Sequence, residues 1–374
     1  MIKFSYYIKK DSSLEKLLGF FLSTSISLVR FSFTLRKINS PGIAVIALHK
    51  LGDTVFTVPA IKALQNEFGK NITIVCYEDS KKIYMLAFVD LHYLILSKED
   101  FNFNGRIANI ITRKKVKDLM AGTIVDLTGA INSASIIFNN RASKIAGFNE
   151  KYFKAIYTDY IPARKIPHQM DMYLDAAKLV VKAAEVESLK YFGKSLNPEG
   201  DILIHPFAGW KAKEWSFNKF VDLSLCLNKY HPCKLIIPKE RSDEETISIL
   251  NGRNISFIIS KDITQFIEII KQASIIIGCD SGAVNIASLL GKPTFIIYGP
   301  TNPKFHLPYG DQHDYIYKEN EFSPKPDEKF GAGDAGRKSP GYDFMSSISV
   351  DEVYLKVISL YKKVFLKELE NNHT

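Results

Sequence analysis

Four loops in this chain hold residues whose types and spacing could bind or transfer a charged group. Each loop follows a short apolar segment that is typical of a buried strand, and most of them lead into a segment with helical periodicity. The loops cover residues 49–54, 206–215, 278–285 and 298–303. Open α/β sheets bind their ligands beyond the carboxyl ends of parallel strands, so these loops are the candidate sites.

The first loop places Gly52 and Asp53 at the start of an expected helix. Gly52 permits a close backbone approach, and Asp53 is either the N-cap of the helix, a common use of aspartate, or a group with a chemical role. Neither G-x-G-x-x-G nor G-x-x-x-x-G-K-S/T occurs here. The loop therefore does not indicate a dinucleotide-binding turn or a P-loop.

The second loop combines small residues with positive charge. Ala208 and Gly209 can expose backbone N–H groups to an anion, and Lys211 and Lys213 add positive charge. The alternative is a solvated basic loop in which Trp215 packs on the following helix. The spacing by itself leaves both interpretations open.

The third loop has the order strand, Gly278, Asp280, Ser281, Gly282 and then helix. Free N–H groups and the helix dipole make such a helix N-terminus a phosphate site. The alternative is that Asp280 and Ser281 are plain caps. The fourth loop, which contains Thr301, is a weak signal for a binding site by itself, but it follows the last expected strand at the same edge of the sheet.

Strands and helices alternate in two runs and must position these loops. Strands are expected at 43–48, 72–77, 93–96, 123–127 and 143–147, and again at 202–205, 234–237, 255–259, 275–277 and 294–297. Helices are expected at 53–68, 109–117, from 132, and at 171–184, 218–230, 243–250, 263–272, 283–290 and 350–369. This alternation predicts parallel sheets. A Gly- and Pro-containing stretch over 191–200 is interpreted as a linker, and residues 319–341 as a long loop.

Length and charge set further limits. A chain of 374 residues favours two domains, and no apolar run is long enough for a polytopic membrane protein. The four cysteines form no C-x-x-C pair, so a disulfide framework or a zinc ribbon is not indicated. Residues 1–40 hold seven Lys and Arg against two Asp and Glu, which is five of the nine net positive charges. A nucleic-acid binder would spread its basic residues over a folded face.

The same N-terminal segment is rich in apolar residues, and residues 17–29 are too few to span a bilayer comfortably. Three interpretations stay open: a helix docked on the first domain, an interfacial helix on an anionic membrane surface, or a cleaved signal that lacks a clear cleavage site.

Taken in order, these segments resemble glycosyltransferase family 9, the lipopolysaccharide heptosyltransferases. The matching patterns are G-D-x-x-x-x-x-P-A at 52–60, D-L-x-G at 126–129, H-P through K-x-W at 205–215, D-S-G with a later Ala at 280–287, G-P-T at 299–301, and F-M with a closing helix signature at 344–353. The chain departs from the family at Asn285, where a histidine is usual. It also departs at Phe207 and Ala208, and it lacks cysteines over 319–341.

The resemblance implies a GT-B fold, in which two Rossmann-like domains face a central cleft, here with an extra N-terminal helical segment. The expected parts are that segment over 1–40, an acceptor-side domain over 41–190, a donor-binding domain over 191–348, and a C-terminal helix over 349–374. That last helix either stays with the second domain or packs back on the first.

The resemblance also implies an inverting, metal-independent transfer of a sugar from a nucleotide-diphosphate donor. Inversion needs one base to accept the proton of the acceptor hydroxyl, and Asp53 is the candidate. The departing diphosphate needs positive charge and N–H donors. The candidate donor-binding residues are Lys213, Asp280, Ser281, Gly282, Asn285, Ala208, Gly209 and Thr301. Glu245 is the candidate for the nucleoside, and Lys50, Gly52 and Thr54 are the candidates for the acceptor.

The expected partners are a nucleotide sugar, with heptose from ADP-heptose as the first choice, and a lipid-linked saccharide such as a bacterial lipopolysaccharide core. No cofactor, metal site or nucleic acid is expected. The expected location is the cytoplasm, either free or peripheral on the inner face of the cytoplasmic membrane. The alternatives are a nucleotide-sugar epimerase of the same fold and a non-catalytic binding protein.

Overall fold

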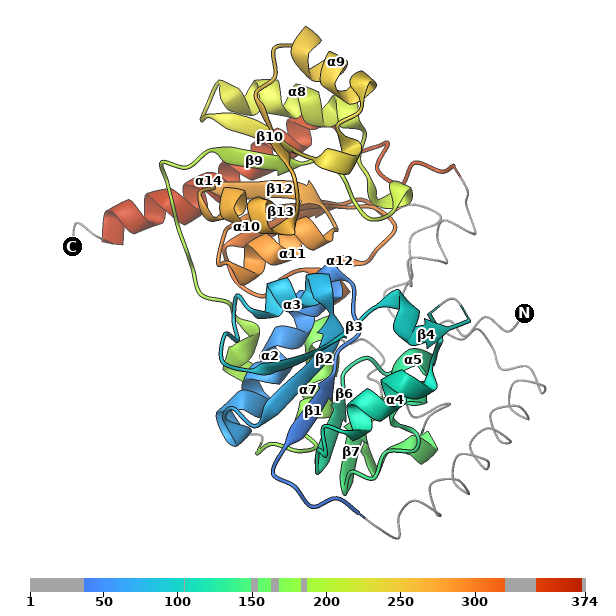
Figure 1. Ribbon diagram of the computed structural model, residues 1–374. Helices are drawn as coiled ribbons and strands as arrows, with labels where there is room; N and C mark the ends of the chain where they lie inside the picture. Colours follow the sequence, from blue (N-terminus) through green and yellow to red (C-terminus); the bar gives the residue numbers. More distant parts are fainter. Residues whose placement is uncertain are drawn as a thin grey trace. The chain divides into compact units, whose positions relative to one another are not determined.

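The computed structural model describes residues 37–103, 105–148, 154–162, 168–182, 187–319 and 341–371. The chain divides into two compact α/β units, Met1–Lys190 and Tyr191–Thr374 (Figure 1). The helical segment expected over residues 1–40 lies outside the described residues except for its last four, and so does most of the loop expected over 319–341.

A six-stranded parallel sheet forms the centre of the first unit. Its strands run in the order β3-β2-β1-β6-β7-β8. Their bounds are β1 (Ile43–Ile46), β2 (Ile72–Tyr77), β3 (His92–Leu96), β6 (Thr123–Asp126), β7 (Lys144–Gly147) and β8 (Asp159–Tyr160). Strand β1 is buried along its whole length, because both faces of a parallel sheet are covered.

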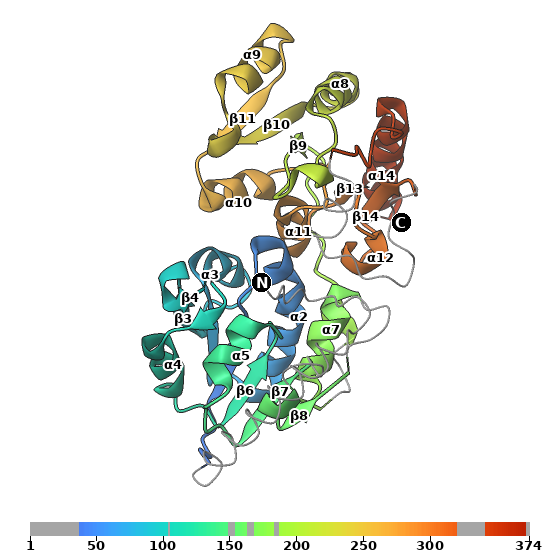
Figure 2. The same ribbon diagram turned by 90° about the vertical axis from the view of Figure 1, so that its right-hand side faces the viewer.

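Helices cover the first sheet on both faces (Figure 2). Helices α2 (Leu51–Phe68), α3 (Glu78–Tyr84) and α7 (Gln169–Ala177) pack together. Helices α4 (Ile110–Lys117) and α5 (Ile131–Ile137) pack on each other and share a core with alternate residues of β1, Ala44 and Ile46. A short hairpin of β4 (Phe101–Asn102) and β5 (Ile107–Ala108) leads into α4, and the 3-10 turns are η1 (Lys98–Asp100), η2 (Lys154–Ile156) and η4 (Glu187–Lys190).

The second unit repeats this strand order as β11-β10-β9-β12-β13-β14, again all parallel. The strands are β9 (Ile202–His205), β10 (Cys233–Pro238), β11 (Phe257–Ser260), β12 (Ile275–Cys279), β13 (Thr294–Tyr298) and β14 (His313–Tyr317). The helices are α8 (Phe217–Asn228), α9 (Glu244–Gly252), α10 (Ile263–Lys271), α11 (Gly282–Leu289), α12 (Pro303–His306) and α14 (Val350–Asn371), with 3-10 turns η5 (Lys211–Lys213) and η6 (Lys239–Arg241).

Helix α14 packs on α8 and β14 within the second unit. Val353 and Val357 are fully buried in one core with Phe220 of α8. These contacts place α14 in the second unit.

The predicted α/β class with two Rossmann-like sheets is confirmed. Helix α2 begins at Leu51 and not at Asp53, and α7 ends at Ala177, short of the expected 184. Strands β8 and β14 and helix α3 were not expected. Strand β8 has two residues, and β14 mixes polar with apolar residues at the sheet edge, so neither has the continuous apolar run of a central strand. None of the helices in the described part of the chain is long and apolar enough to cross a membrane.

In each sheet the chain adds strands first toward one edge and then toward the other. The change occurs between β1 and β6 in the first sheet and between β9 and β12 in the second. Ile46 pairs with Asp126 there, and Gly278 pairs with His205. The loops that follow these paired residues therefore begin side by side. Such switch points are where doubly wound sheets bind ligands.

Candidate active site

The switch point of the second sheet holds a buried charged pair. Asp280, directly after β12, accepts a hydrogen bond from Lys213 Nζ at 2.6 Å. Its same oxygen, Oδ2, accepts from Thr301 Oγ1 at 2.7 Å. The Asp280 side chain is 5% exposed and that of Lys213 is 18% exposed. The structure thus brings together candidate residues from three of the four loops.

The Asp280 carboxyl group is ionised in the folded protein. Burial alone would raise the pKa of Asp280, but the ammonium of Lys213, the nearby His306 and the two hydrogen bonds outweigh burial and lower this pKa to about 2. Asp280 therefore orients both the Lys213 ammonium and the Thr301 hydroxyl. His306 of α12 was not among the expected site residues.

Helix α11 begins beside this pair, and the end of β12 that leads into it lies close to β9. A Cβ at Gly278 would lie 2.9 Å from the carbonyl oxygen of His205, so only glycine fits there without displacement. Ser281 is the N-cap residue of α11, but its side chain makes no capping hydrogen bond. Within the described part of the chain, Ser281 Oγ and Asn285 Oδ1 are buried without a hydrogen-bond partner. The structure therefore does not support the plain-cap alternative for the Ser281 side chain.

A buried glutamate that sequence reasoning missed shapes the loop after β9. Glu214 is 3% exposed and accepts hydrogen bonds from Arg241 Nη2 at 2.7 Å, Lys211 Nζ at 3.0 Å and the Ala208 N–H at 3.2 Å. The Ala208 N–H, expected to face an anion, is thus already used inside the loop. The signal in the sequence was an acid between two lysines and a tryptophan, which also suits a solvated loop.

Aromatic contacts fix the two ends of the same loop. Phe207 stacks on Phe217 with an interplanar angle of 18°, and the guanidinium of Arg241 lies 5.1 Å from the Phe207 ring. Trp215 is buried and meets Phe220 of α8 edge to face at 5.0 Å. The packing proposed as the alternative role of Trp215 is therefore present, and it coexists with the charged pair formed by Lys213.

Two further candidates lie at the margins of this region. A Cβ at Gly209 would meet nothing within 4 Å, so the loop is open there. Glu245 is exposed in the first turn of α9, behind the N-cap Asp243, and lies on a different element from the Lys213–Asp280 pair.

The switch point of the first sheet carries the residues expected near the acceptor. Lys50 is exposed and is the N-cap residue of α2, while Gly52 and Asp53 are half-buried in its first turn. Asp53 is therefore not the N-cap, and its carboxylate instead lies in the first turn, where the helix dipole favours negative charge. Thr54 is fully buried, and its hydroxyl donates to the Lys50 carbonyl at 3.0 Å and to Ser80 Oγ at 3.1 Å.

Two residues that were not expected tie the first loop to the end of β6. Thr128 Oγ1 accepts from the Leu48 N–H at 2.9 Å, and His49 Nε2 lies 3.1 Å from the Leu127 carbonyl. Burial lowers the pKa of His49 to about 4 despite this hydrogen bond, so the ring is neutral at pH 7. Because a carbonyl only accepts, Nε2 carries the proton and Nδ1 keeps a lone pair.

The D-L-x-G segment builds the turn after β6. Asp126 is buried and accepts from the N–H groups of Thr128 and Gly129, at 2.9 and 3.0 Å, and from Ser133 Oγ and Tyr157 OH, at 2.9 and 2.8 Å. Gly129 has φ +57°, in the left-handed region that glycine adopts without strain. This aspartate therefore stabilises the turn that places Leu127 and Thr128.

Metal-ligating side chains do not gather in the described ranges: no three His, Cys, Asp or Glu residues there are arranged to hold an ion.

The fold is that of GT-B glycosyltransferases. The family 9 glycosyltransferase from Veillonella parvula matches with a TM-score of 0.67 and 18% identity, over 88% of this chain and 99% of that one. The E. coli ADP-heptose lipopolysaccharide heptosyltransferase II matches with a TM-score of 0.63 and 15% identity, over 86% and 99%. E. coli heptosyltransferase WaaC with ADP matches with a TM-score of 0.61 and 13% identity, over 85% of this chain and 99% of that one.

The model of glycosyltransferase family 9 (heptosyltransferase) matches residues 112–331, more than half of the chain. The protein belongs to this family and is a glycosyltransferase. No curated protein matches its sequence.

Proposed function

We propose that this enzyme transfers heptose from ADP-heptose to a lipopolysaccharide core or a related lipid-linked saccharide, with inversion at the anomeric carbon and without a metal ion. The observation that carries the proposal is the Lys213–Asp280–Thr301 cluster at the start of α11, at the switch point of the second sheet. The names of two similar proteins support the choice of nucleotide, because one is an ADP-heptose heptosyltransferase and the other was solved with ADP.

In the proposed donor site, the diphosphate meets Lys213, Ser281 and the first N–H groups of α11. An ammonium has three donors and Asp280 uses one, so Lys213 can still donate to phosphate oxygens. Asp280 holds the ammonium in place but also offsets its charge, so the helix dipole and the Ser281 hydroxyl supply part of the attraction. Asn285 adds an uncharged amide, and Gly209 lies at the open part of the loop. Glu245 is proposed for the ribose.

In the proposed acceptor site, Asp53 removes the proton from the acceptor hydroxyl while its oxygen attacks the anomeric carbon. The bond between that carbon and the β-phosphate oxygen breaks, and ADP leaves with the negative charge. Lys50 and Gly52 are proposed to contact the acceptor. Thr54 is proposed to hold these residues in place without contacting the acceptor, because its hydroxyl makes its hydrogen bonds to Lys50 and Ser80 inside the unit.

The proposed location is the cytoplasm, with peripheral attachment to the inner face of the cytoplasmic membrane, where a lipid-linked acceptor is found. The basic and apolar composition of residues 1–40 supports attachment to an anionic leaflet.

The Asp53→Asn variant tests the mechanism. It should keep donor affinity and lower turnover by about a hundredfold or more, because the amide cannot accept the proton. ADP release in the presence of acceptor measures turnover, and thermal unfolding checks that the variant is folded. Turnover close to that of the wild-type enzyme would remove Asp53 from the mechanism.

A panel of ADP-, UDP-, GDP- and CDP-sugars tests the donor. ADP-heptose should raise the unfolding temperature most and should release ADP only when acceptor is consumed. Preference for another nucleotide would overturn the choice of donor, and release without acceptor would indicate a hydrolase or epimerase. Full activity after EDTA treatment is the expected result for metal independence, and activity restored only by a divalent cation would contradict it.

A further inference from the structure

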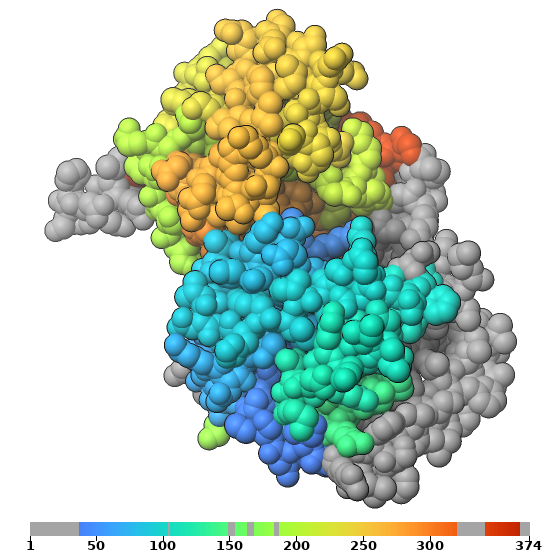
Figure 3. Space-filling model, in the orientation of Figure 1, coloured from blue at the N-terminus to red at the C-terminus, as the bar shows by residue number. Residues whose placement is uncertain are grey.

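Three large apolar side chains lie exposed close together in the chain, on the β4–β5 hairpin and at the start of α4. Phe103 is 78% exposed, Ile110 76% and Ile111 63%. Phe103 also has φ +52°, a left-handed conformation that is costly for a bulky residue. The hairpin and α4 lie on the face of the first unit seen in Figure 3.

Basic residues surround these apolar side chains. Residues 100–118 contain Arg106, Arg113, Lys114, Lys115 and Lys117 against two carboxylates, Asp118 and the buried Asp100. In α4, Thr112 and Val116 face the core. The helical period then places Ile110, Lys114 and Asp118 on the opposite side, with Ile111 beside them. We call the set Phe103, Arg106, Ile110, Ile111 and Lys114 the hairpin–α4 surface.

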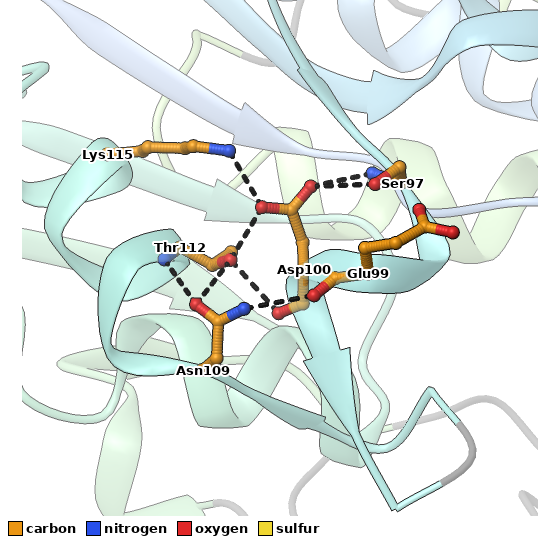
Figure 4. A network of polar contacts seen from close by, with 6 residues as sticks. All are labelled: Ser97, Glu99, Asp100, Asn109, Thr112 and Lys115. Atoms are coloured by element: carbon orange, nitrogen blue, oxygen red, sulfur yellow. Dashed lines mark hydrogen bonds and ion pairs between the residues drawn. The ribbon is translucent and has the colours of Figure 1, made fainter.

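A polar network around the buried Asp100 ties the 3-10 turn η1, which precedes the hairpin, to α4 (Figure 4). Asp100 accepts from Lys115 Nζ at 2.8 Å, Thr112 Oγ1 at 2.7 Å and the Ser97 N–H at 2.8 Å. Burial opposes ionisation, but these hydrogen bonds prevail and lower the pKa of Asp100 to about 2. Asn109 caps α4 through the Thr112 N–H at 2.9 Å and donates to the Glu99 carbonyl at 3.0 Å. This network therefore fixes the start of α4, where Ile110 and Ile111 lie.

Like charges gather at the other end of α4. Partial burial and then the neighbouring guanidinium groups of Arg141 and Arg113 lower the pKa of Lys117. Arg113 lies 5.5 Å from the Phe138 ring. Positive charge thus extends along α4 beyond the hairpin–α4 surface.

We propose that the hairpin–α4 surface binds an anionic lipid bilayer, with Phe103, Ile110 and Ile111 entering the headgroup region and Arg106 and Lys114 contacting lipid phosphates. Exposed apolar side chains among basic ones are the composition of interfacial membrane-binding segments. Charge selects this occupant over two others. Residues 1–40 and a second copy of this surface both carry net positive charge, whereas an anionic leaflet carries the opposite charge. The proposal needs no sugar transfer and stands independently of the proposed reaction.

Vesicle co-sedimentation of the full-length protein tests this proposal. The wild-type protein should bind vesicles that contain phosphatidylglycerol more tightly than vesicles of phosphatidylcholine alone. The affinity of the Phe103→Ser/Ile110→Ser/Ile111→Ser variant for the anionic vesicles should be lower by about tenfold or more. The matched control is Val89→Ser, because Val89 is 75% exposed in the same unit but outside the surface. It should bind like the wild type.

Charge-reversal variants measure the electrostatic contribution to vesicle binding separately from the apolar one. Arg106→Glu/Lys114→Glu should weaken binding to anionic vesicles severalfold and should leave weak binding to neutral vesicles unchanged. Lys62→Glu, at an exposed position of α2, is the control. Equal binding of wild type and both surface variants would overturn the proposal and would assign any vesicle binding to another part of the chain.

A site-specific probe gives an answer that does not depend on other attachment points. An environment-sensitive dye on Ile111→Cys should shift to shorter wavelength with anionic vesicles and should be quenched by brominated lipid, whereas the same dye on Val89→Cys should not. Three of the four native cysteines are buried, which limits background labelling. No shift at Ile111→Cys on vesicle-bound protein would place this surface away from the bilayer, and a shift that depends on protein concentration without vesicles would indicate a second copy.

Discussion

At the scale of single residues, Asp280 decides the character of the candidate donor site. It holds Lys213 and Thr301 through one oxygen and is almost completely buried. Removing one partner of such a pair leaves an uncompensated charge, which costs more than the pair itself contributes. Variants of Lys213 and Asp280 must therefore be judged by ligand affinity and by stability together.

Lys213→Ala should weaken nucleotide-sugar binding by on the order of 2 kcal/mol, because it removes a partly desolvated charge from the diphosphate. Calorimetric titration with ADP measures the change, and thermal unfolding reports the separate cost of leaving Asp280 unpaired. Lys211→Ala is the matched control in the same loop, since Lys211 is 88% exposed and pairs with Glu214. It should leave ADP affinity unchanged. Unchanged ADP affinity in Lys213→Ala, with loss of acceptor binding, would assign the second unit to the acceptor.

At the scale of elements, the close approach of β9 and β12 positions the site. The register pairs Gly278 with His205, and the two loops that carry Lys213 and Asp280 start from this point. A side chain at Gly278 would push against the backbone of β9 and against Val284 of α11, and both support the site.

Gly278→Ala should lower the free energy of unfolding by about 1–3 kcal/mol, the usual cost of overpacking a buried position. Denaturant unfolding measures it. Gly209→Ala is the control, because a Cβ there meets nothing within 4 Å, and it should change stability by less than about 0.5 kcal/mol. Equal stability of the two variants would show that the strand pair can separate at little cost.

At the scale of the whole molecule, histidines in both units make the fold sensitive to acid. Burial lowers the pKa of His49, His205 and His313 from 6.5 to about 4. The unfolded chain therefore takes up protons at a higher pH than the folded chain does. Stability is complete above about pH 6.5 and is lost as the pH falls from there toward 4.

A set of unfolding curves between pH 8 and pH 4 should show this loss, with each histidine contributing roughly 3 kcal/mol at most. His313→Asn should reduce the slope, because asparagine does not titrate and its amide oxygen can replace Nδ1 as the partner of Thr294 Oγ1. Asp280 and Asp100, with pKa values of about 2, should add to the loss only below about pH 4. A slope unchanged by His313→Asn would mean that other groups cause the acid sensitivity.

Apolar runs along the chain were sufficient to predict the class of fold and most of the strands. The run at residues 275–277 and the glycine after it predict a buried strand that turns at once into a helix, whatever the rest of the molecule does. Turn chemistry is equally local. It predicted that helices begin near Asp53 and at Ser281, although the N-cap residue of α2 is Lys50.

Which side chains meet was decided only by the tertiary structure. Lys213 and Asp280 are 67 residues apart, and the parallel pairing of β9 with β12 brings them to hydrogen-bond distance. Glu214 and Arg241 meet in the same way, across the neighbouring strand β10. Sequence pattern determines how each segment folds because that depends on near neighbours, whereas strand order and register determine the site because they join residues that are distant along the chain.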